Sequence, residues 1–301
     1  MGEPFATSGD WAMPARPDSR VQMFQVDAFT SERFRGNPAG VCIPEVRLPE
    51  SLCQAIATEM NLSETAFLHP VGRKRDAIPR FGLQWFTPLK EVDLCGHATL
   101  ATARVLFSET GIDAETVAFD TKSGALFAHR ESGKVRIDLP SSPPMLTEIP
   151  DGLFEALGIT SLVNVARSQG GLTFILVEVE EEDEVTSLRP DFRALKAIGG
   201  DAPPEGVIVT SCGVNKRTDG PMPDFVSRVF CPWCGIDEDP VTGAAHTLLG
   251  PYWSPRLGGK REMMAEQVSR RGGEMIVRID GTRVHLIGDA VVVLEGTMKL
   301  D

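Results

Sequence analysis

Hydrophobic residues fall along this chain in short runs, most of them bounded by Gly, Pro, Asn or Asp. Such runs, rich in Val, Ile and Phe, predict β-strands. We expect strands at 21–29, 39–44, 64–70, 81–88, 116–121, 125–130, 134–140, 162–166, 172–179, 206–211, 224–230, 274–280, 283–288 and 290–296. Helical spacing is rarer and predicts helices at 49–60, 96–111, 151–157, 191–198 and 242–253. Strands outnumber helices and do not alternate regularly with them, so the pattern predicts an α+β protein.

Pro-rich punctuation divides the chain into two halves of similar content. The segment 141–150, SSPPMLTEIP, breaks both periodicities and is predicted to link a first domain, 21–140, to a second, 151–301. The sequence leaves open whether the last strand packs on the first domain. Residues 1–20 are rich in Pro, Gly, Ser and Asp and predict a flexible extension. The acidic run 180–185 predicts a solvated surface turn.

The two halves also repeat one another. FGLQWFTP at 81–88 leads through CGHATL into a helix, and VSRVFCP at 226–232 leads through TGAAHTLL into another. Further along, SGALFAHRESGKVRIDL at 123–139 resembles GGEMIVRIDGTRVHLIG at 272–288. A duplicated domain explains this spacing, which is too long for a solenoid. Two related domains that face each other leave a cleft between them, which is a common position for a ligand.

Composition and charge narrow the choice of partner. The 301 residues include 30 Lys and Arg against 42 Asp and Glu, a formal net charge of −12 at pH 7. A chain this acidic repels phosphates, so no nucleic-acid partner is expected. No apolar run approaches the roughly 20 residues of a membrane helix, and no secretory pattern stands at the start. We therefore expect a cytoplasmic protein with reduced cysteines and no membrane partner.

Two segments in the first half carry candidate chemistry. Glu64, in NLSETAF, lies between a predicted helix and a predicted strand among apolar residues, and partial burial would raise its pKa toward useful acid–base work. The alternative is a helix-end carboxylate in water. In DLCGHAT, 93–99, Gly96 allows a ligand to approach the free amides of a helix start, and His97 could donate to an anion or move a proton. The alternative is a helix start with an incidental histidine.

A third candidate segment is DEDPVTGAAH, 237–246. Asp239 before Pro240 is typical of a helix start, with Asp as N-cap and Pro as the first helical residue. Capping alone explains this pair, but the segment holds the repeat position of DLCGHAT, and Gly243 again could bring amides to an anion. The two helix starts are therefore predicted to face each other and form a pocket for a small carboxylate. Asn37, in the turn sequence GNP, could reach the same cleft.

Sequence motifs for cofactors and metals are missing. The chain has no Gly-x-Gly-x-x-Gly after a strand, no Walker loop and no Gly-x-Ser-x-Gly elbow. Cys231 and Cys234 form a C-x-x-C pair, but no second paired motif supplies the other ligands of a structural zinc. An acidic turn follows the pair where a thioredoxin-type helix would begin. We expect neither a metal nor a cofactor.

In five ordered segments the chain resembles the PhzF-like (phenazine biosynthesis-like) family, and most closely its animal-type members. The segments are VDAFTSERFRGNPAGVC, NLSETAF, FTPLKEVDLCGHATLA, EDPVTGAAH and the closing RGGEMIVRIDGTRVHLIGDAVVVLEGTM. The resemblance implies the diaminopimelate epimerase-like fold, two similar α+β domains that each wrap a mostly antiparallel sheet around a central helix. It also implies a homodimer and cofactor-independent isomerisation of a small carboxylic acid by proton transfer in the interdomain cleft.

The resemblance further implies roles for single residues. Glu64 matches the family's acid/base glutamate and would remove a proton from carbon and return one elsewhere. His97 and Asp239 would orient the substrate or assist proton movement. The positions that match contacts to the substrate carboxylate or lie beside the site are Gly96, Gly243, Ala244 and Asn37. Ala244 stands where many members have Ser, which puts a phenazine-type substrate in question.

Two other interpretations remain open. A non-catalytic interaction protein could keep this fold, since fold does not guarantee function, although a scaffold has no need of Glu64, His97 and Asp239 together. Fold relatives that racemise amino acids use two opposed cysteines. Cys95 lies where one of these would fall, but Asp239 holds the opposite position. An epimerase or racemase that uses Cys95 is therefore the less favoured alternative, and a small buried thiol is the simpler interpretation.

Overall fold

The computed structural model describes residues 20–71, 78–169, 173–200, 202–215 and 221–300. Apart from Arg20, the predicted extension 1–20 lies outside the described residues. The first half begins as a strand pair, continues through a short helix and closes on a meander. Its elements are β1 (Arg20–Ala28), β2 (Asn37–Ile43), α1 (Glu50–Met60), β3 (Glu64–Pro70), β4 (Arg80–Phe86), β5 (Glu91–Val92), α2 (Gly96–Glu109), β6 (Thr116–Thr121), β7 (Gly124–Glu131) and β8 (Lys134–Pro140).

The second half has the same order of elements, with short helices added. Its elements are β9 (Met145–Leu146), α3 (Leu153–Leu157), β10 (Asn164–Arg167), β11 (Phe174–Glu178), α4 (Glu182–Ser187), α5 (Phe192–Ala197), β12 (Gly206–Cys212), β13 (Phe225–Phe230), the 3-10 helix η1 (Pro232–Cys234), β14 (Glu238–Asp239), α6 (Gly243–Arg256), β15 (Glu262–Gln267), β16 (Gly273–Asp280), β17 (Arg283–Gly288) and β18 (Ala290–Lys299). Within the described residues, no helix has the length and apolar content to cross a membrane.

The pairing of the strands shows the duplication directly. In the first half, β2 pairs parallel with β3, β3 antiparallel with β4, β4 parallel with β6, and β6, β7 and β8 follow antiparallel. In the second half, β11, β12, β13, β15, β16 and β17 repeat this series in the same order and directions. The remaining pairings between described strands are antiparallel, so the sheets are mostly antiparallel, as predicted.

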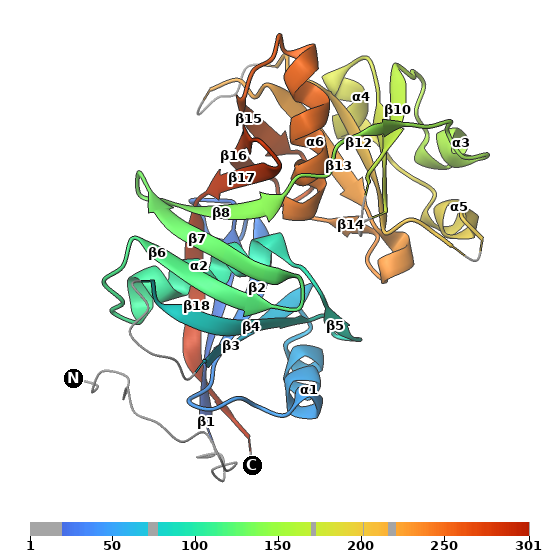
Figure 1. Cartoon of the computed structure of the whole chain (residues 1–301). Coiled ribbons are helices and arrows are strands. Elements are labelled where there is room, and N and C mark those ends of the chain that lie inside the picture. Colours follow the sequence, from blue (N-terminus) through green and yellow to red (C-terminus); the bar gives the residue numbers. More distant parts are fainter. Residues whose placement is uncertain (1–19, 72–77, 170–172, 201, 216–220, 301) are drawn as a thin grey trace.

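Two strand pairings tie the halves together. β8 pairs with the whole of β17, from Val135 opposite Gly288 to Pro140 opposite Arg283, and so joins the two meanders edge to edge. β18 leaves the second half and pairs antiparallel with β1, from Ala290 opposite Ala28 to Lys299 opposite Arg20. Figure 1 shows β18 running down beside β1, so that the last strand completes the sheet of the first half.

Each sheet curls around one long helix (Figure 1). α2 lies against β1, β2, β3, β7, β8 and β18, and 11 of its 14 residues are buried. α6 lies against β8, β16 and β17 and is buried to a similar degree. A helix that is apolar on all sides is stable only in such an enclosed position. The two helices share one continuous hydrophobic core, in which Ile137 of β8 lies opposite Leu286 of β17.

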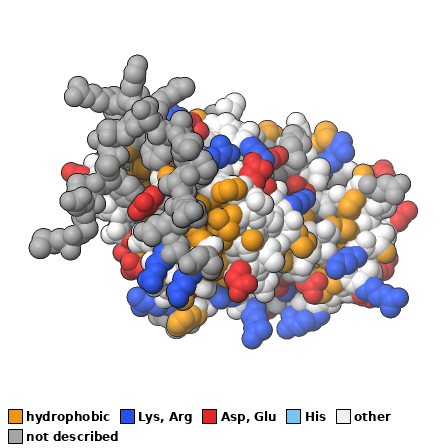
Figure 2. Space-filling view, turned by 90° about the horizontal axis from the view of Figure 1, so that it is seen from below, with side chains coloured by type: hydrophobic (Ala, Val, Ile, Leu, Met, Phe, Trp, Pro, Cys, Tyr) orange, Lys and Arg blue, Asp and Glu red, His pale blue; other side chains and the backbone are white. Residues whose placement is uncertain are grey.

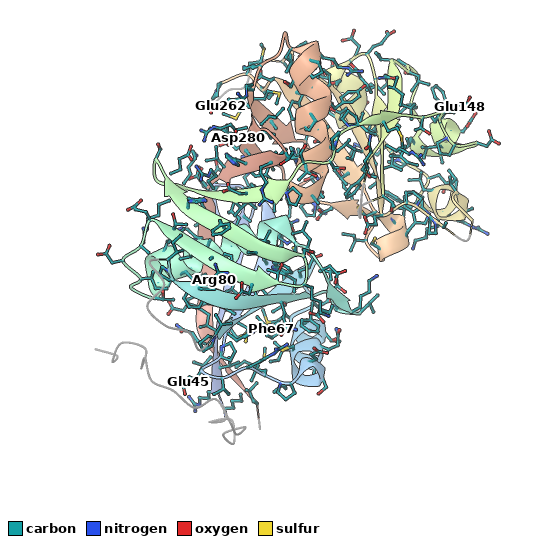
Figure 3. The ribbon with its side chains drawn as sticks, in the orientation of Figure 1. Glu45, Phe67, Arg80, Glu148, Glu262 and Asp280 are labelled. Atoms are coloured by element: carbon teal, nitrogen blue, oxygen red, sulfur yellow. The ribbon has the colours of Figure 1, made fainter. Side chains whose placement is uncertain are left out.

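Shorter helices cover smaller cores on the outside. α1 closes a cluster in which Cys53 and Ile56 meet Phe67 of β3, and Figure 3 shows Phe67 between that helix and the sheet. α3, α4 and α5 close a corresponding cluster in the second half. On the face shown in Figure 2, acidic and basic side chains are interspersed and form no single basic stripe.

Two local predictions from the sequence are wrong. The acidic run 180–185 is not a solvated turn, because its last four residues begin α4 and Glu182 is buried. The Glu182 carboxylate accepts hydrogen bonds from the backbone N–H groups of Val214 and Asn215 at 2.8 and 2.9 Å. β15 was not predicted, although it pairs with both β13 and β16.

Candidate active site

The two long helices meet at their N-termini. α2 begins at Gly96 and α6 at Gly243, and a Cβ atom placed on either glycine would lie 3.3 Å from the Cα atom of the other. The residues before them, Cys95 and Thr242, are extended and make no side-chain cap. The first amides of each helix have no partner within their own helix and carry the positive end of its dipole. The predicted juxtaposition of two helix starts is therefore present in the structure, with Ala244 half-buried in the first turn of α6.

The helix predicted at 242–253 starts within one residue of its expected position, but the capping role predicted for Asp239 and Pro240 is wrong. Asp239 does not cap the helix and Pro240 is not its first residue, because α6 begins at Gly243 with Thr242 as N-cap. Asp239 instead ends β14, where it pairs with Val229 of β13. Freed from capping, its carboxylate is directed to side chains on both halves of the protein.

Glu64 and His97 form the first half of the site. Glu64 is the first residue of β3, and its side chain is one-fifth exposed; His97, in the first turn of α2, is almost fully buried. Its Nε2 lies 3.3 Å from Glu64 Oε2, while Nδ1 lies 3.5 Å from Cys95 Sγ. With Glu64 ionised, Nε2 carries the proton and Nδ1 accepts from the thiol.

Burial shifts both titrating groups toward their neutral forms. It raises the pKa of Glu64; His97 opposes this shift, and the Asp239 charge adds to it. Burial lowers the pKa of His97, with Glu64 acting against it. A neutral histidine beside a carboxylate with a raised pKa is a typical acid–base arrangement, because the proton of Glu64 is then exchanged nearer to neutral pH.

Asp239 and Asn37 form the other half of the site. Asn37 Nδ2 donates to Asp239 Oδ1 at 2.8 Å and to the Val241 carbonyl at 2.9 Å. The Thr242 hydroxyl donates to Asp239 Oδ2 at 2.5 Å. Burial raises the pKa of Asp239, and the bonds from Thr242 and Asn37 lower it. Both carboxylate oxygens are thus occupied, which fixes the orientation of the group.

Three residues that the sequence did not single out complete the network. The Ser63 hydroxyl donates to Asn37 Oδ1 at 3.1 Å and lies 3.4 Å from His97 Nε2, so it connects the two halves of the site. Gln267 of β15 donates to the Asp239 carbonyl at 2.7 Å and accepts from the Thr242 N–H at 2.8 Å. Ser63 and Thr242 stood inside the motifs already noted, whereas no sequence signal marked Gln267.

The predicted residues Glu64, His97, Asp239, Asn37, Gly96, Gly243 and Ala244 are therefore gathered at one place, where the two helix starts meet. Glu64 and His97 come from the first half of the chain, and Asp239 comes from the second half. The Glu64 carboxylate is partly exposed, and the first amides of the two helices have no partner within their own helix. This arrangement can hold a small anion and move a proton beside it.

Three side chains of types that bind metal ions also meet at this site, since single ligand atoms of Glu64, Cys95 and His97 lie within 4.8 Å of one another. A thiol binds metal as the thiolate. Burial, followed by the Glu64 charge, raises the pKa of Cys95 well above its usual value, so its proton is held firmly. In this protonated form the thiol can donate a hydrogen bond within the cluster.

The cysteines contribute no second motif to the site. All six, each in a described segment, are free thiols. Cys231 is buried and Cys234 is exposed at the two ends of the short turn formed by η1, and burial raises the pKa of both. The position equivalent to Cys95 holds Thr242, and not Asp239 as predicted, because Cys95 and Thr242 are the residues that precede the two long helices. A pair of opposed thiols is therefore absent from this described site.

The chain is similar to known proteins along nearly its whole length. A family model described as phenazine biosynthesis-like protein (PhzC–PhzF) matches residues 26–296. The chain belongs to the PhzC–PhzF family. The phenazine biosynthesis-like domain-containing protein 2 of Mus musculus is 45% identical over 289 residues, which cover 93% of this chain and 99% of the mouse protein. An uncharacterized isomerase of Halalkalibacterium halodurans is 42% identical over 280 residues, which cover 92% of this chain and 98% of that protein.

Solved structures of PhzC–PhzF proteins have the same fold. The PhzF-family protein of Enterococcus faecalis superposes with a TM-score of 0.82 at 40% identity and covers 93% of this chain and 100% of its own. A hydroxyproline epimerase of Agrobacterium vitis superposes with a TM-score of 0.60 at 13% identity, covers 95% and 93%, and shares the fold alone. The predicted family, the fold class and the enzyme class, an isomerase, are confirmed.

Proposed function

We propose that this PhzC–PhzF protein is a cofactor-independent isomerase that moves a proton on a small carboxylic acid, with Glu64 as general acid and base. The observation that carries the proposal is the position of Glu64. Its carboxylate, with a raised pKa, lies 3.3 Å from neutral His97 at the point where two helix N-termini meet. Amides for an anion and a base for a carbon acid are thus side by side.

In the proposed reaction the substrate carboxylate binds to the first amides of α2 and α6, at Gly96 and at Gly243 and Ala244. Ionised Glu64 removes a proton from a carbon atom of the bound acid, so that a C–H bond breaks and an O–H bond forms. The electron pair spreads over the unsaturated substrate, and the amides and helix dipoles stabilise the developing charge. The same carboxyl group then returns a proton to another carbon, which leaves no net oxidation or reduction.

The neighbours of Glu64 have supporting parts in this proposal. His97 donates from Nε2 to Glu64 and holds the carboxylate toward the ligand. Asp239, with both oxygens held by Asn37 and Thr242, adds negative charge that raises the pKa of Glu64. Ala244 offers its amide without a hydroxyl, which favours an acid that needs no hydroxyl contact at this position.

The two alternatives explain less of the structure. A purely structural protein gains nothing from three buried titratable side chains, since apolar residues of similar volume stabilise a core as well or better. A Cys95 base would need a thiolate, and the pKa of that thiol is raised well above its usual value by burial. Neither alternative uses the two helix starts.

Solvent hydrogen exchange tests the proposal. Wild type, Glu64→Gln and the matched control Glu59→Gln, an exposed glutamate on α1, are incubated in heavy water with a panel of small unsaturated and amino carboxylic acids. Mass spectrometry reports deuterium gained at carbon, and calorimetry reports binding. We expect Glu64→Gln to lose about 10²–10⁴-fold in rate and Glu59→Gln to lose nothing.

Two results would contradict the proposal. An unchanged rate in Glu64→Gln would exclude Glu64 as the base. An acid that binds wild type with no exchange at carbon would point to a binding protein instead. Dialysis against a chelator should leave the exchange rate unaltered, because the proposed reaction uses no metal.

The proposal extends to the state of the protein in the cell. We propose a cytoplasmic homodimer that binds a small carboxylic acid and neither nucleic acid nor membrane. The net charge of −12 supports the exclusion of nucleic acid. Sedimentation of the purified protein tests the dimer, and a monomer at micromolar concentration would contradict it.

A further inference from the structure

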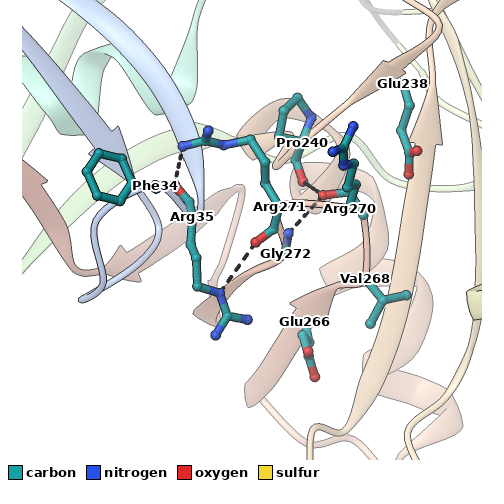
Figure 4. Close-up of a pocket in the computed structure, with 10 residues that line it drawn as sticks. Phe34, Arg35, Glu238, Pro240, Glu266, Val268, Arg270, Arg271 and Gly272 are labelled. Atoms are coloured by element: carbon teal, nitrogen blue, oxygen red, sulfur yellow. Dashed lines mark hydrogen bonds between the residues drawn. The ribbon is translucent and has the colours of Figure 1, made fainter. Parts of the chain in front are cut away.

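The β15–β16 turn of the second half, around Ser269–Gly273, is hydrogen-bonded to the segment of the first half that leads into Asn37. The guanidinium of Arg271 donates three hydrogen bonds across this junction. Its Nε donates to the Gly36 carbonyl at 2.7 Å, and one terminal nitrogen donates to the Arg35 carbonyl at 2.7 Å and to Asp27 Oδ1 at 2.9 Å. Figure 4 shows Arg271 reaching back to the Arg35 backbone at the edge of an open pocket of about 840 Å³.

The segment that leads into Asn37 also donates hydrogen bonds to the β15–β16 turn. The Gly36 N–H donates to the Gly272 carbonyl at 2.8 Å, and Arg35 Nε donates to the Arg271 carbonyl at 3.4 Å. The second oxygen of Asp27 accepts from the Phe34 N–H at 2.6 Å. Asp27 is thus fully enclosed and uses both carboxylate oxygens to hold the turn and the arginine.

These contacts impose a strained backbone. Phe34 has φ of 71° although its side chain is 73% exposed, so side-chain packing does not explain the left-handed conformation. Gly36 has φ of 62°, and a Cβ there would lie 2.2 Å from the Ala28 carbonyl oxygen. The turn therefore keeps its shape through the bonds to Asp27 and Arg271.

Asn37 follows this turn immediately and holds the Asp239 carboxylate. We propose that Arg271 is a positioning residue of the site: by fixing Gly36 and Asp27 it sets where Asn37 stands, and through Asn37 it holds Asp239 toward Glu64. This inference rests on the proposed function, since it assigns Arg271 to the geometry of the same reaction. It concerns a residue that contacts neither the substrate position nor Glu64.

The choice of residue supports a positioning role. An isolated buried ion pair is weak evidence for stability, because desolvation opposes the attraction. The planar fork of arginine can serve the Gly36, Arg35 and Asp27 oxygens at once, whereas the single ammonium of lysine cannot match that geometry. The bonds, more than the charge, should therefore carry the effect.

The test compares Arg271→Lys and Arg271→Gln with Arg270→Gln, the matched control from the same turn, whose exposed side chain lines the same pocket. The readouts are kcat, KM and the titration of the Asp239 carboxyl carbon by NMR. The bond from Asn37 lowers the pKa of Asp239, so loosening Asn37 should raise the titration midpoint. We expect both Arg271 variants to show this rise and to lose up to about 100-fold in kcat, with KM little changed. Arg270→Gln should match wild type.

The outcomes separate this inference from the proposed function. An Asp239 titration and a kcat unchanged in Arg271→Gln would overturn the positioning role while leaving Glu64 as the base. A lower melting temperature with an unchanged titration would mean a structural role only and would also overturn it. If Glu64 proved not to be the base, kcat would no longer test the positioning role, but the Asp239 titration in the Arg271 variants would still test it. Should Arg271→Gln not fold, Asp27→Asn keeps an acceptor for the Phe34 N–H, removes the charge, and should raise the Asp239 midpoint in the same way.

Discussion

The contact between Gly96 and Gly243 leads to a quantitative prediction about the two helix starts. An alanine Cβ at 96 would lie 3.3 Å from Gly243 Cα and 3.5 Å from Leu139 Cδ1. At 243 it would lie 3.3 Å from both Gly96 Cα and Leu286 Cδ1. Carbon atoms pack best at about 3.5–4.0 Å. Each substitution must therefore push two buried helices apart by a few tenths of an ångström, and backbone atoms cannot rotate away as a side-chain tip can.

The expected cost follows from two opposing effects. Overpacking a core costs about 1–3 kcal/mol, and alanine offsets up to about 1 kcal/mol of this through its better helix propensity. We expect Gly96→Ala and Gly243→Ala each to lower the free energy of unfolding by about 1 kcal/mol. In the double variant the two new Cβ atoms face each other, so the loss should exceed the sum by about 1 kcal/mol. Activity should fall further, by about 100-fold, because the amides move.

Urea unfolding of the four proteins, followed by tryptophan fluorescence, measures the free energies, and the exchange assay measures activity. Gly296→Ala in β18 is the control, because a Cβ there meets nothing within 4 Å. Purely additive effects, or single variants as stable and active as wild type, would refute the described contact and the role of the helix amides.

Three further predictions concern titrating groups. Burial raises the pKa of Glu64, and the Asp239 charge adds to this shift, so kcat/KM should rise with pH through a raised midpoint. Asp239→Asn should move this midpoint to lower pH. An unmoved midpoint would show that the Asp239 charge does not act on Glu64. Burial raises the pKa of Asp138, but contacts with His129, His285 and Arg136 outweigh burial, so the pKa is lowered in the folded protein. Ionised Asp138 therefore stabilises the folded state fully above the unfolded pKa of about 3.9, and this stabilisation is lost as the pH falls below it. The difference in urea midpoint between wild type and Asp138→Asn should accordingly close as pH falls below about 4, and a constant difference would contradict the pairing. Burial holds the Cys95 thiol protonated, so Cys95→Ser should retain activity; a loss as large as that of Glu64→Gln would favour the cysteine alternative.

Local sequence pattern was sufficient for the architecture because both halves follow the same rules. Each long helix starts at a glycine after an extended residue, and each follows a mostly apolar strand that ends in Phe, at Phe86 and Phe230. The repeat of 81–88 and 226–232 predicted equivalent strands, and β4 and β13 hold equivalent places in the pairing order. The segments of His97 and Asp239 could be grouped because they hold equivalent positions in the repeat, and the family resemblance added Glu64 to them.

The features that were missed depend on distant contacts. EMMAEQ at 262–267 is made of residues that favour helices, and it becomes β15 only because β13 and β16 pair on both sides of it. Gln267 therefore had no predicted position from which to reach Asp239. Glu182 can be buried because a backbone N–H group 32 residues away donates a hydrogen bond to its carboxylate. Asp239-Pro240 matched a helix start, but Asn37, 202 residues distant, holds that aspartate outside the helix.

The asymmetry of the duplicated site bears on the kind of isomerisation. Gly96 and Gly243 are equivalent, and Thr99 and His246 are too, since each bonds to the carbonyl of the residue before its helix, at 2.5 and 2.8 Å. The equivalent of His97, however, is Ala244, so the helix start of the second half has no histidine that could hydrogen-bond to a catalytic carboxylate. Asp239 has both oxygens engaged. Racemisation by two bases needs a free base on each face of the substrate carbon. Glu64 is the more exposed of the two carboxylates. A single accessible base favours removal and return of the proton on one face, and hence migration of a proton between two carbons of the same acid.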